Sequence, residues 1–150
     1  MTKQQTIHEI IKLAIRREEE AHNFLLAISA CAESPEIKSM LESMAKEELE
    51  HKEKLELELM KLGEVVHIGQ IPQGSENPYY FESEECSDMD YGDLLRLAIE
   101  KEDISFHLYM NLASQMHQQK TRDIFTALAE EELRHKLRFE DEYNNYLNQK

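Results

Sequence analysis

Apolar residues recur at alternating steps of three and four along four segments of the chain, the spacing of one face of an α-helix. Two segments precede Gly63, with apolar positions at Ile7, Ile11, Ala14, Ala21, Leu25 and Ile28, then at Ile37, Leu41, Met44, Leu55, Leu59 and Leu62. Two follow Asp90, with Tyr91, Leu95, Ala98, Tyr109 and Leu112, then Phe125, Leu128, Phe139, Tyr143 and Tyr146. The pattern predicts four amphipathic helices.

Local signals place the ends of these helices. Ser34-Pro35 is typical of an N-cap followed by proline at the first helical position, and Gly63 is a stop signal. The period is lost from about 64 to 89, which predicts a long loop able to carry the chain back along a bundle. We therefore expect an all-α single domain over 1–150: one helical hairpin over about 3–63, a crossover loop, and a second hairpin over about 90–148.

Acidic and imidazole side chains interrupt the apolar stripes at matching positions. A glutamate lies in the middle of the first and third stripes, and a Glu-x-x-His motif lies in the second and fourth. The residues pair as Glu18 with Glu102, Glu48 with Glu132 and His51 with His135, each pair 84 residues apart. Leu13-Ala14-Ile15 likewise returns as Leu97-Ala98-Ile99. The two hairpins are an internal duplication.

Burial of these six residues has a consequence for charge. Four carboxylates in an apolar core repel one another and lose their hydration, at a cost of several kcal/mol per ion. Two divalent cations would balance four negative charges, with the imidazoles as neutral nitrogen ligands, and a three-residue step places both side chains of a Glu-x-x-His on one helix face. The predicted metal ligands are Glu18, Glu48, His51, Glu102, Glu132 and His135.

Glu47 and Glu131 precede the histidines by four residues and could also face them. The apolar phase selects Glu48 and Glu132 instead, because these share the stripe with the histidines. We expect Glu47 and Glu131 at the stripe edge in solvent, with a supporting role beside the metal as the alternative. His22, one turn from Glu18, is off the stripe and is expected at the surface.

Composition narrows the classes of partner. The net charge of −14 argues against nucleic acid and anionic membranes, both of which select basic patches. No stretch approaches the roughly 20 apolar residues of a membrane span, and the charged amphipathic start lacks a signal-peptide apolar region. Only Cys31 and Cys86 are present, and they form no Cys-x-x-Cys pair. We expect a cytoplasmic protein.

The motifs Ala14-Ile15-Arg16-Arg17-Glu18 with Glu48-x-x-His51, and Ala98-Ile99-Glu100-Lys101-Glu102 with Glu132-x-x-His135, resemble the rubrerythrin-like branch of the ferritin-like superfamily. The resemblance covers nearly all of the chain outside the central loop. It implies a ferritin-like four-helix bundle, a carboxylate-bridged centre of two iron ions, and redox chemistry with oxygen or hydrogen peroxide. Glutamate and histidine ligands also suit manganese and zinc, so the metal stays open.

The resemblance favours a di-iron peroxidase or oxidase. Rubrerythrins proper add a rubredoxin-like domain with two Cys-x-x-Cys pairs, which residues 1–150 lack, so we expect an external electron donor such as a rubredoxin-like protein. Rubrerythrins and the related symerythrins also tend to carry an extra carboxylate one turn beyond a helix glutamate. This chain has Ala21 and Ser105 at those positions, which weakens the peroxidase assignment. The alternatives are a ferroxidase that handles ferrous iron and a metal-stabilised bundle without turnover.

We expect a homodimer or larger homo-oligomer. Tyr109 is a candidate catalytic residue, with a packing role as the alternative.

Overall fold

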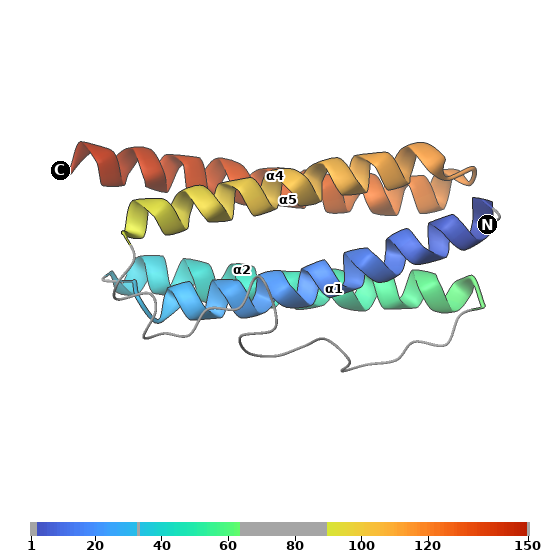
Figure 1. Ribbon diagram of the computed structural model, residues 1–150, viewed down its shortest axis with the longest axis horizontal. Helices are drawn as coiled ribbons and strands as arrows, with labels where there is room; N and C mark the ends of the chain where they lie inside the picture. Colours follow the sequence, from blue (N-terminus) through green and yellow to red (C-terminus); the bar gives the residue numbers. More distant parts are fainter. Residues whose placement is uncertain (1–2, 33, 64–89, 150) are drawn as a thin grey trace. The chain divides into compact units, whose positions relative to one another are not determined.

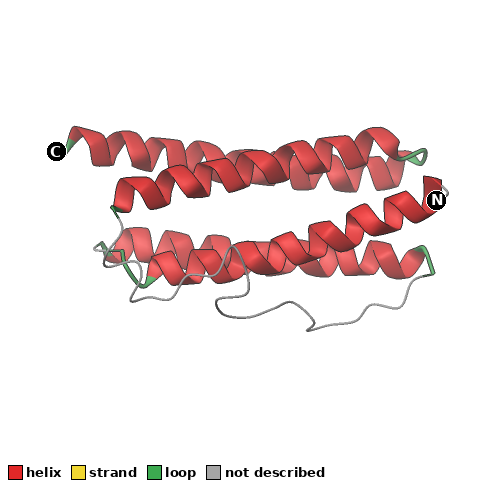
Figure 2. Ribbon diagram, viewed as in Figure 1, coloured by secondary structure: helices red, strands yellow, loops and turns green. Residues whose placement is uncertain are grey.

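The computed structural model describes residues 3–32, 34–63 and 90–149. These residues form four helices: α1 (Lys3–Ser29), α2 (Pro35–Lys61), α4 (Tyr91–Gln115) and α5 (Gln119–Asn148) (Figures 1 and 2). Within the described ranges there is no strand. The prediction of four helices is therefore confirmed, whereas the predicted crossover loop lies outside the described residues.

The chain divides into two compact units, residues 1–88 and 89–150. Each unit contains one helical hairpin, which we call hairpin 1 (α1 and α2) and hairpin 2 (α4 and α5); the two helices of each hairpin pack side by side (Figure 1). The predicted pairing of helices within each hairpin is confirmed. Whether the two units form one domain stays a prediction. No helix in the described part of the chain has the length and apolar character needed to cross a membrane.

The helix-end signals predicted for α2 in hairpin 1 are present in the structure. The Ser34 side chain accepts hydrogen bonds from the backbone N–H groups of Glu36 and Ile37, and Pro35 occupies the first turn of α2. These bonds satisfy two of the donors that the start of a helix leaves without partners. At the other end Gly63 has a φ of 87°, a left-handed conformation that glycine adopts without strain.

The two helices of hairpin 2 begin with different capping arrangements. Asp90 caps α4 by accepting a hydrogen bond from Gly92 N (3.1 Å) and another from the Tyr146 hydroxyl. Gly92 permits this approach, because a Cβ there would lie 2.8 Å from Tyr146 Cε1. At the opposite end a three-residue link leads into α5, whose N-cap residue Gln118 makes no side-chain capping bond.

The apolar stripes form the buried core, as predicted. Fully buried positions lie on every helix: Ile11, Ala14, Leu25 and Ile28; Leu41, Met44, Leu55 and Leu59; Leu95, Ala98, Tyr109 and Leu112; Phe125, Leu128 and Phe139. The stripes weaken toward the helix ends, where Ile7, Tyr143 and Tyr146 are half-buried. Leu62 is exposed, because it follows the last residue of α2 and no longer lies on the helical face.

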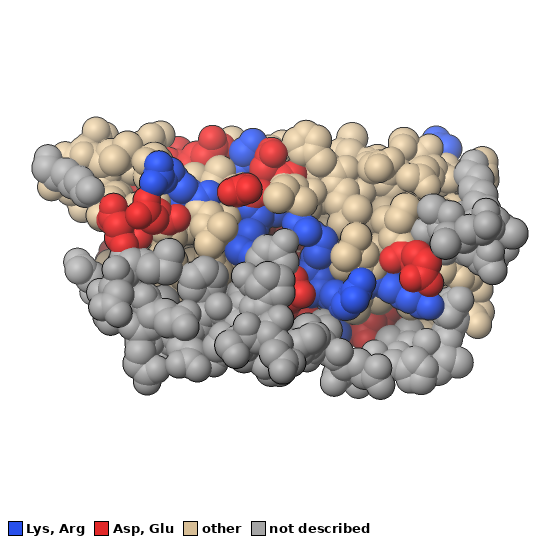
Figure 3. All heavy atoms as spheres, in the orientation of Figure 1, with Lys and Arg blue, Asp and Glu red and all other residues tan. Residues whose placement is uncertain are grey.

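On the face seen in Figure 3, basic groups lie beside acidic ones, among larger areas of uncharged residues. Lys12 lies 3.5 Å from Glu9 and Arg134 lies 3.5 Å from Glu131, each one turn apart on a single helix. Exposed ion pairs of this kind contribute about 0–1 kcal/mol to stability. They therefore leave the burial of the apolar stripes as the main source of stability.

Candidate metal centre

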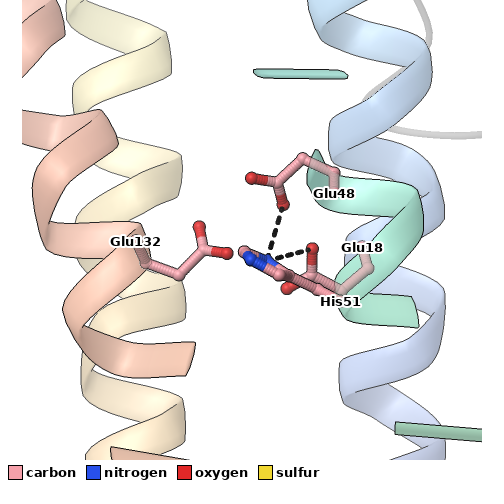
Figure 4. A group of neighbouring side chains, drawn as sticks. All are labelled: Glu18, Glu48, His51 and Glu132. Atoms are coloured by element: carbon pink, nitrogen blue, oxygen red, sulfur yellow. Dashed lines mark ion pairs between the residues drawn. The ribbon is translucent and has the colours of Figure 1, made fainter. Parts of the chain in front are cut away.

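Three predicted ligands meet inside hairpin 1. Glu18 projects from α1, and Glu48 and His51 project from α2 (Figure 4). His51 Nδ1 lies 3.5 Å from Glu18 Oε2 and 4.0 Å from Glu48 Oε2, and one donor atom of each residue lies within 4.8 Å of the others. We call these residues triad 1.

Hairpin 2 repeats the arrangement. Glu102 projects from α4, and Glu132 and His135 project from α5. His135 Nδ1 lies 3.7 Å from Glu102 Oε2, and the three residues again offer donor atoms within 4.8 Å of one another. We call these residues triad 2. Each helical hairpin therefore brings its own glutamate and its own Glu-x-x-His motif together.

All six side chains are buried. Glu18 and Glu48 are 1% exposed, Glu132 is 0% exposed and Glu102 is 4% exposed, while the two histidines are similarly enclosed. Buried carboxylates need partners that favour their charge, because the loss of hydration costs several kcal/mol per ion. Among the described residues, Glu102 Oε2 accepts no hydrogen bond although it is buried. A bound cation would supply such a partner to the Glu102 carboxylate.

The triads fit a divalent metal in donor type, spacing and charge. Carboxylate oxygen and imidazole nitrogen suit iron, manganese and zinc. Two donors that share a metal through bonds of about 2.1 Å lie roughly 3–4 Å apart, and the observed separations of 3.5, 3.7 and 4.0 Å agree with this. Each triad carries two carboxylates and one imidazole, so one divalent cation would neutralise each.

The adjacent glutamates differ in burial. Glu48 and Glu132 are buried beside the histidines, whereas Glu47 and Glu131 are half-buried at the stripe edge. The Glu131 carboxylate lies 3.5 Å from Arg134 on the same helix, with 30% of its side chain exposed. The expectation that Glu47 and Glu131 lie in solvent was therefore too strong, although their position at the edge is confirmed.

The chain matches a known protein family over most of its length. The Rubrerythrin family model matches residues 9–143, which include all six triad residues. The chain belongs to the rubrerythrin family. Among curated proteins, none matches this chain significantly.

Solved structures show the fold. A hypothetical protein from Pyrococcus furiosus is similar with a TM-score of 0.79 and 24% sequence identity, over 96% of this chain and 92% of that one. Bacterioferritin from Desulfovibrio desulfuricans, a protein described as having a diiron site, is similar with a TM-score of 0.71 and 17% identity, over 97% of this chain and 82% of that one. The predicted all-α, ferritin-like class is confirmed.

Tyr109, the candidate catalytic residue of this rubrerythrin-family chain, is 1% exposed. It lies on α4, seven residues and therefore about two turns after Glu102, on the same helix face. Its counterpart in hairpin 1 is Leu25, which is also buried. These observations place Tyr109 in the core; its catalytic role stays a prediction.

His22 differs from expectation. It is half-buried, and its Nδ1 lies 2.9 Å from the backbone oxygen of Ala45 on α2. Because a carbonyl oxygen only accepts hydrogen bonds, Nδ1 must carry the proton. The prediction of a surface histidine was wrong, because it considered only the stripe of α1 and not the neighbouring helix.

Two ion pairs beside the triads were not predicted. Lys52 Nζ on α2 lies 3.1 Å from Glu19 Oε2 on α1, and Lys136 Nζ on α5 lies 2.9 Å from Asp103 Oδ1 on α4. The hydrogen bond from Lys136 lowers the pKa of Asp103, and that same bond raises the pKa of Lys136. A signal was present in the sequence, since both residues of the first pair recur 84 residues later with their charge kept.

Proposed function

We propose that the two triads hold two iron ions and that the protein is a di-iron oxidoreductase, which reduces hydrogen peroxide or oxygen with electrons from an external donor. The observation that carries the proposal is the repetition of one buried Glu, Glu-x-x-His triad in both hairpins. Membership of the rubrerythrin family supports it. The diiron site named for the similar bacterioferritin agrees with the same assignment.

The protein residues have distinct roles in this proposal. The four glutamates supply negative charge and oxygen donors, while His51 and His135 supply neutral nitrogen donors through Nδ1. Iron bound here would supply the two electrons that reduce hydrogen peroxide, with two protons, to two water molecules, and would recover them from the donor. Burial of the side chains keeps bulk water away and strengthens the interaction between carboxylates and cations.

Electron supply must come from outside residues 1–150. Cys31 and Cys86 do not form the Cys-x-x-Cys pairs that hold a rubredoxin-type iron. We therefore propose a separate rubredoxin-like protein as the donor, in the cytoplasm. A donor of this kind would make turnover depend on added reductant.

A ferroxidase function is the second candidate, and one feature of the sequence weakens the peroxidase assignment relative to it. Ala21 and Ser105 occupy the positions one turn after Glu18 and Glu102, where an extra carboxylate accompanies the peroxidase resemblance. Both residues are half-buried on their helices. The missing carboxylate weakens the peroxidase assignment, and in the ferroxidase alternative the same centre oxidises ferrous iron as its substrate and passes it on.

Stopped-flow spectroscopy tests the proposal. Iron-loaded protein, reduced without oxygen, should develop ferric absorption when mixed with peroxide or oxygen, and should cycle only with an external reductant. Faster oxidation by peroxide would support a peroxidase, whereas continued oxidation of ferrous iron well beyond two per chain would support a ferroxidase. Absence of reaction with either oxidant would overturn both and leave a metal-stabilised bundle.

A further inference from the structure

The ion pairs Lys52–Glu19 and Lys136–Asp103 each join the two helices of one hairpin. Every one of their four residues directly follows a triad residue in sequence: Glu19 follows Glu18, Lys52 follows His51, Asp103 follows Glu102 and Lys136 follows His135. The two pairs are related by the same 84-residue repeat as the triads. The duplication therefore contains a cross-helix ion pair as well as a set of metal donors.

Helix geometry places each pair at the level of its triad. Consecutive residues project about 100° apart around a helix and rise only 1.5 Å along it. In hairpin 1 the same turns of α1 and α2 are thus joined twice, by Glu18 with His51 at 3.5 Å and by Glu19 with Lys52 at 3.1 Å. The ion pair lies on the flank of the hairpin, beside the donors.

The lysines of these two pairs are more enclosed than the basic residues of the ion pairs within single helices. The Lys52 and Glu19 side chains are 13% and 16% exposed, and those of Lys136 and Asp103 are 26% and 39% exposed. Lys12 and Glu9, paired along α1, are 41% and 62% exposed. Long side chains held in one enclosed geometry restrict how far the two helices can separate or slide at that level.

We propose that Lys52 and Lys136 are positioning residues that act through their ion pairs with Glu19 and Asp103. They hold the triad glutamate of α1 or α4 within metal-binding distance of the Glu-x-x-His motif on the other helix of the same hairpin. This inference rests on the proposed metal centre. A donor set must be held to within about 0.5 Å to bind metal well. Outer partners that orient metal ligands typically change affinity by about 10–100-fold when removed.

Electrostatics and positioning predict opposite signs for one substitution. Removing the positive charge of Lys52 or Lys136 makes the surroundings more negative, so charge alone would raise the affinity for a cation. Loss of positioning would lower it. Lysine-to-methionine variants, which keep much of the side-chain volume, therefore separate the two effects.

The test is a cobalt(II) titration of the metal-free full chain, followed through the visible ligand-field bands. We expect the double variant Lys52→Met/Lys136→Met to bind cobalt at least about 10-fold more weakly than the parent and to show altered bands. Lys12→Met is the matched control, because it removes an equal charge from an ion pair within one helix and should leave both unchanged. Lys52→Arg/Lys136→Arg should restore binding.

Thermal melts of the metal-free variants provide the second measurement. Retained cobalt affinity, or tighter binding, in the methionine double variant would overturn the proposal. A loss of folding in the metal-free form large enough to account for the weaker binding would also overturn it, with the arginine variant serving as the folded reference. Failure of the parent to bind cobalt would instead reject the metal centre itself, and this role with it.

Discussion

Hairpins 1 and 2 carry the same donors and the same cross-helix ion pair, yet they fill their interiors differently. Buried leucines at positions 25, 41 and 55 of hairpin 1 correspond to Tyr109, Phe125 and Phe139 of hairpin 2. The comparison shows that the apolar volume around the donors can change while the donor types stay the same. An apolar position needs only a suitable volume, whereas a metal donor needs a particular atom at a particular place.

The hairpins also differ at positions that supply no metal donor. Ser34 caps α2 with its side chain, whereas Gln118 does not cap α5. Glu58 is buried and pairs with Lys61 at 3.0 Å, but its counterpart Glu142 has Asn145 where that lysine would be. Burial raises the pKa of Glu142. The differences are local, so each can be tested by matched substitutions in the two hairpins.

Substitution of the metal donors themselves should have the greatest effect. Iron-reconstituted parent protein should contain about two iron ions per chain by elemental analysis, and Glu48→Ala/Glu132→Ala should contain almost none, because each hairpin loses one carboxylate and its charge balance. Glu47→Ala/Glu131→Ala is the control and should keep about two. A Glu48→Ala/Glu132→Ala protein that still holds two ions would remove this ligand assignment.

The next effect concerns the different interiors. Phe139→Ala in hairpin 2 should cost about 3–5 kcal/mol of unfolding free energy, and Leu55→Ala at the matching position about 2–5 kcal/mol. Both side chains are 0% exposed, and the larger one leaves the larger cavity. Urea unfolding of the metal-free proteins measures both values. A larger cost for Leu55→Ala would show that hairpin 1 collapses less readily around a cavity.

A smaller difference is expected at the helix starts. Ser34→Ala should lower the unfolding free energy by about 1 kcal/mol, because it removes the acceptor for two backbone N–H groups of α2. Gln118→Ala should change it by less than about 0.5 kcal/mol, since Gln118 makes no capping bond. Equal losses in thermal melts of the two variants would contradict the assigned capping difference.

The smallest effect depends on pH. Because the pKa of Glu142 is raised in the folded protein, its neutral form contributes stability that is complete below the unfolded value of about 4.3 and is lost as pH rises through the folded value. Glu142→Gln should therefore be slightly more stable than the parent at pH 7, by roughly 0.5 kcal/mol or less. The difference should vanish below about pH 4.

Glu58→Gln is the matched variant for this experiment. It removes the ion pair with Lys61, so it should not raise the stability at pH 7. Thermal melts of both variants between pH 4 and pH 7 give the comparison. If Glu142→Gln were less stable than the parent at pH 7, the carboxylate would be stabilised by a charge partner and the assigned cause of its pKa shift would be wrong.

The helices, their buried stripes and the six candidate donors could be predicted from the sequence alone. All of these follow from the period of a single helix: a residue such as Glu48 is buried because its neighbours at three and four residues are apolar. A single Glu-x-x-His motif is weak evidence for a metal site. The exact repeat makes the prediction stronger, because His51 and His135 recur with their glutamates at one spacing. The helix ends at Ser34 and Gly63 could also be predicted, since helix ends depend on local backbone chemistry.

Which side chains meet across a hairpin depends on the packing of one helix against the other and could not be predicted from the sequence. The bond from His22 to Ala45 and the pair of Lys52 with Glu19 depend on how far one helix is rotated and shifted along the other. That offset results from the packing of whole helix faces, which no period within a single segment reports. The half-buried state of Glu47 has the same origin, because a residue at the edge of a stripe is covered or exposed by the neighbouring helix.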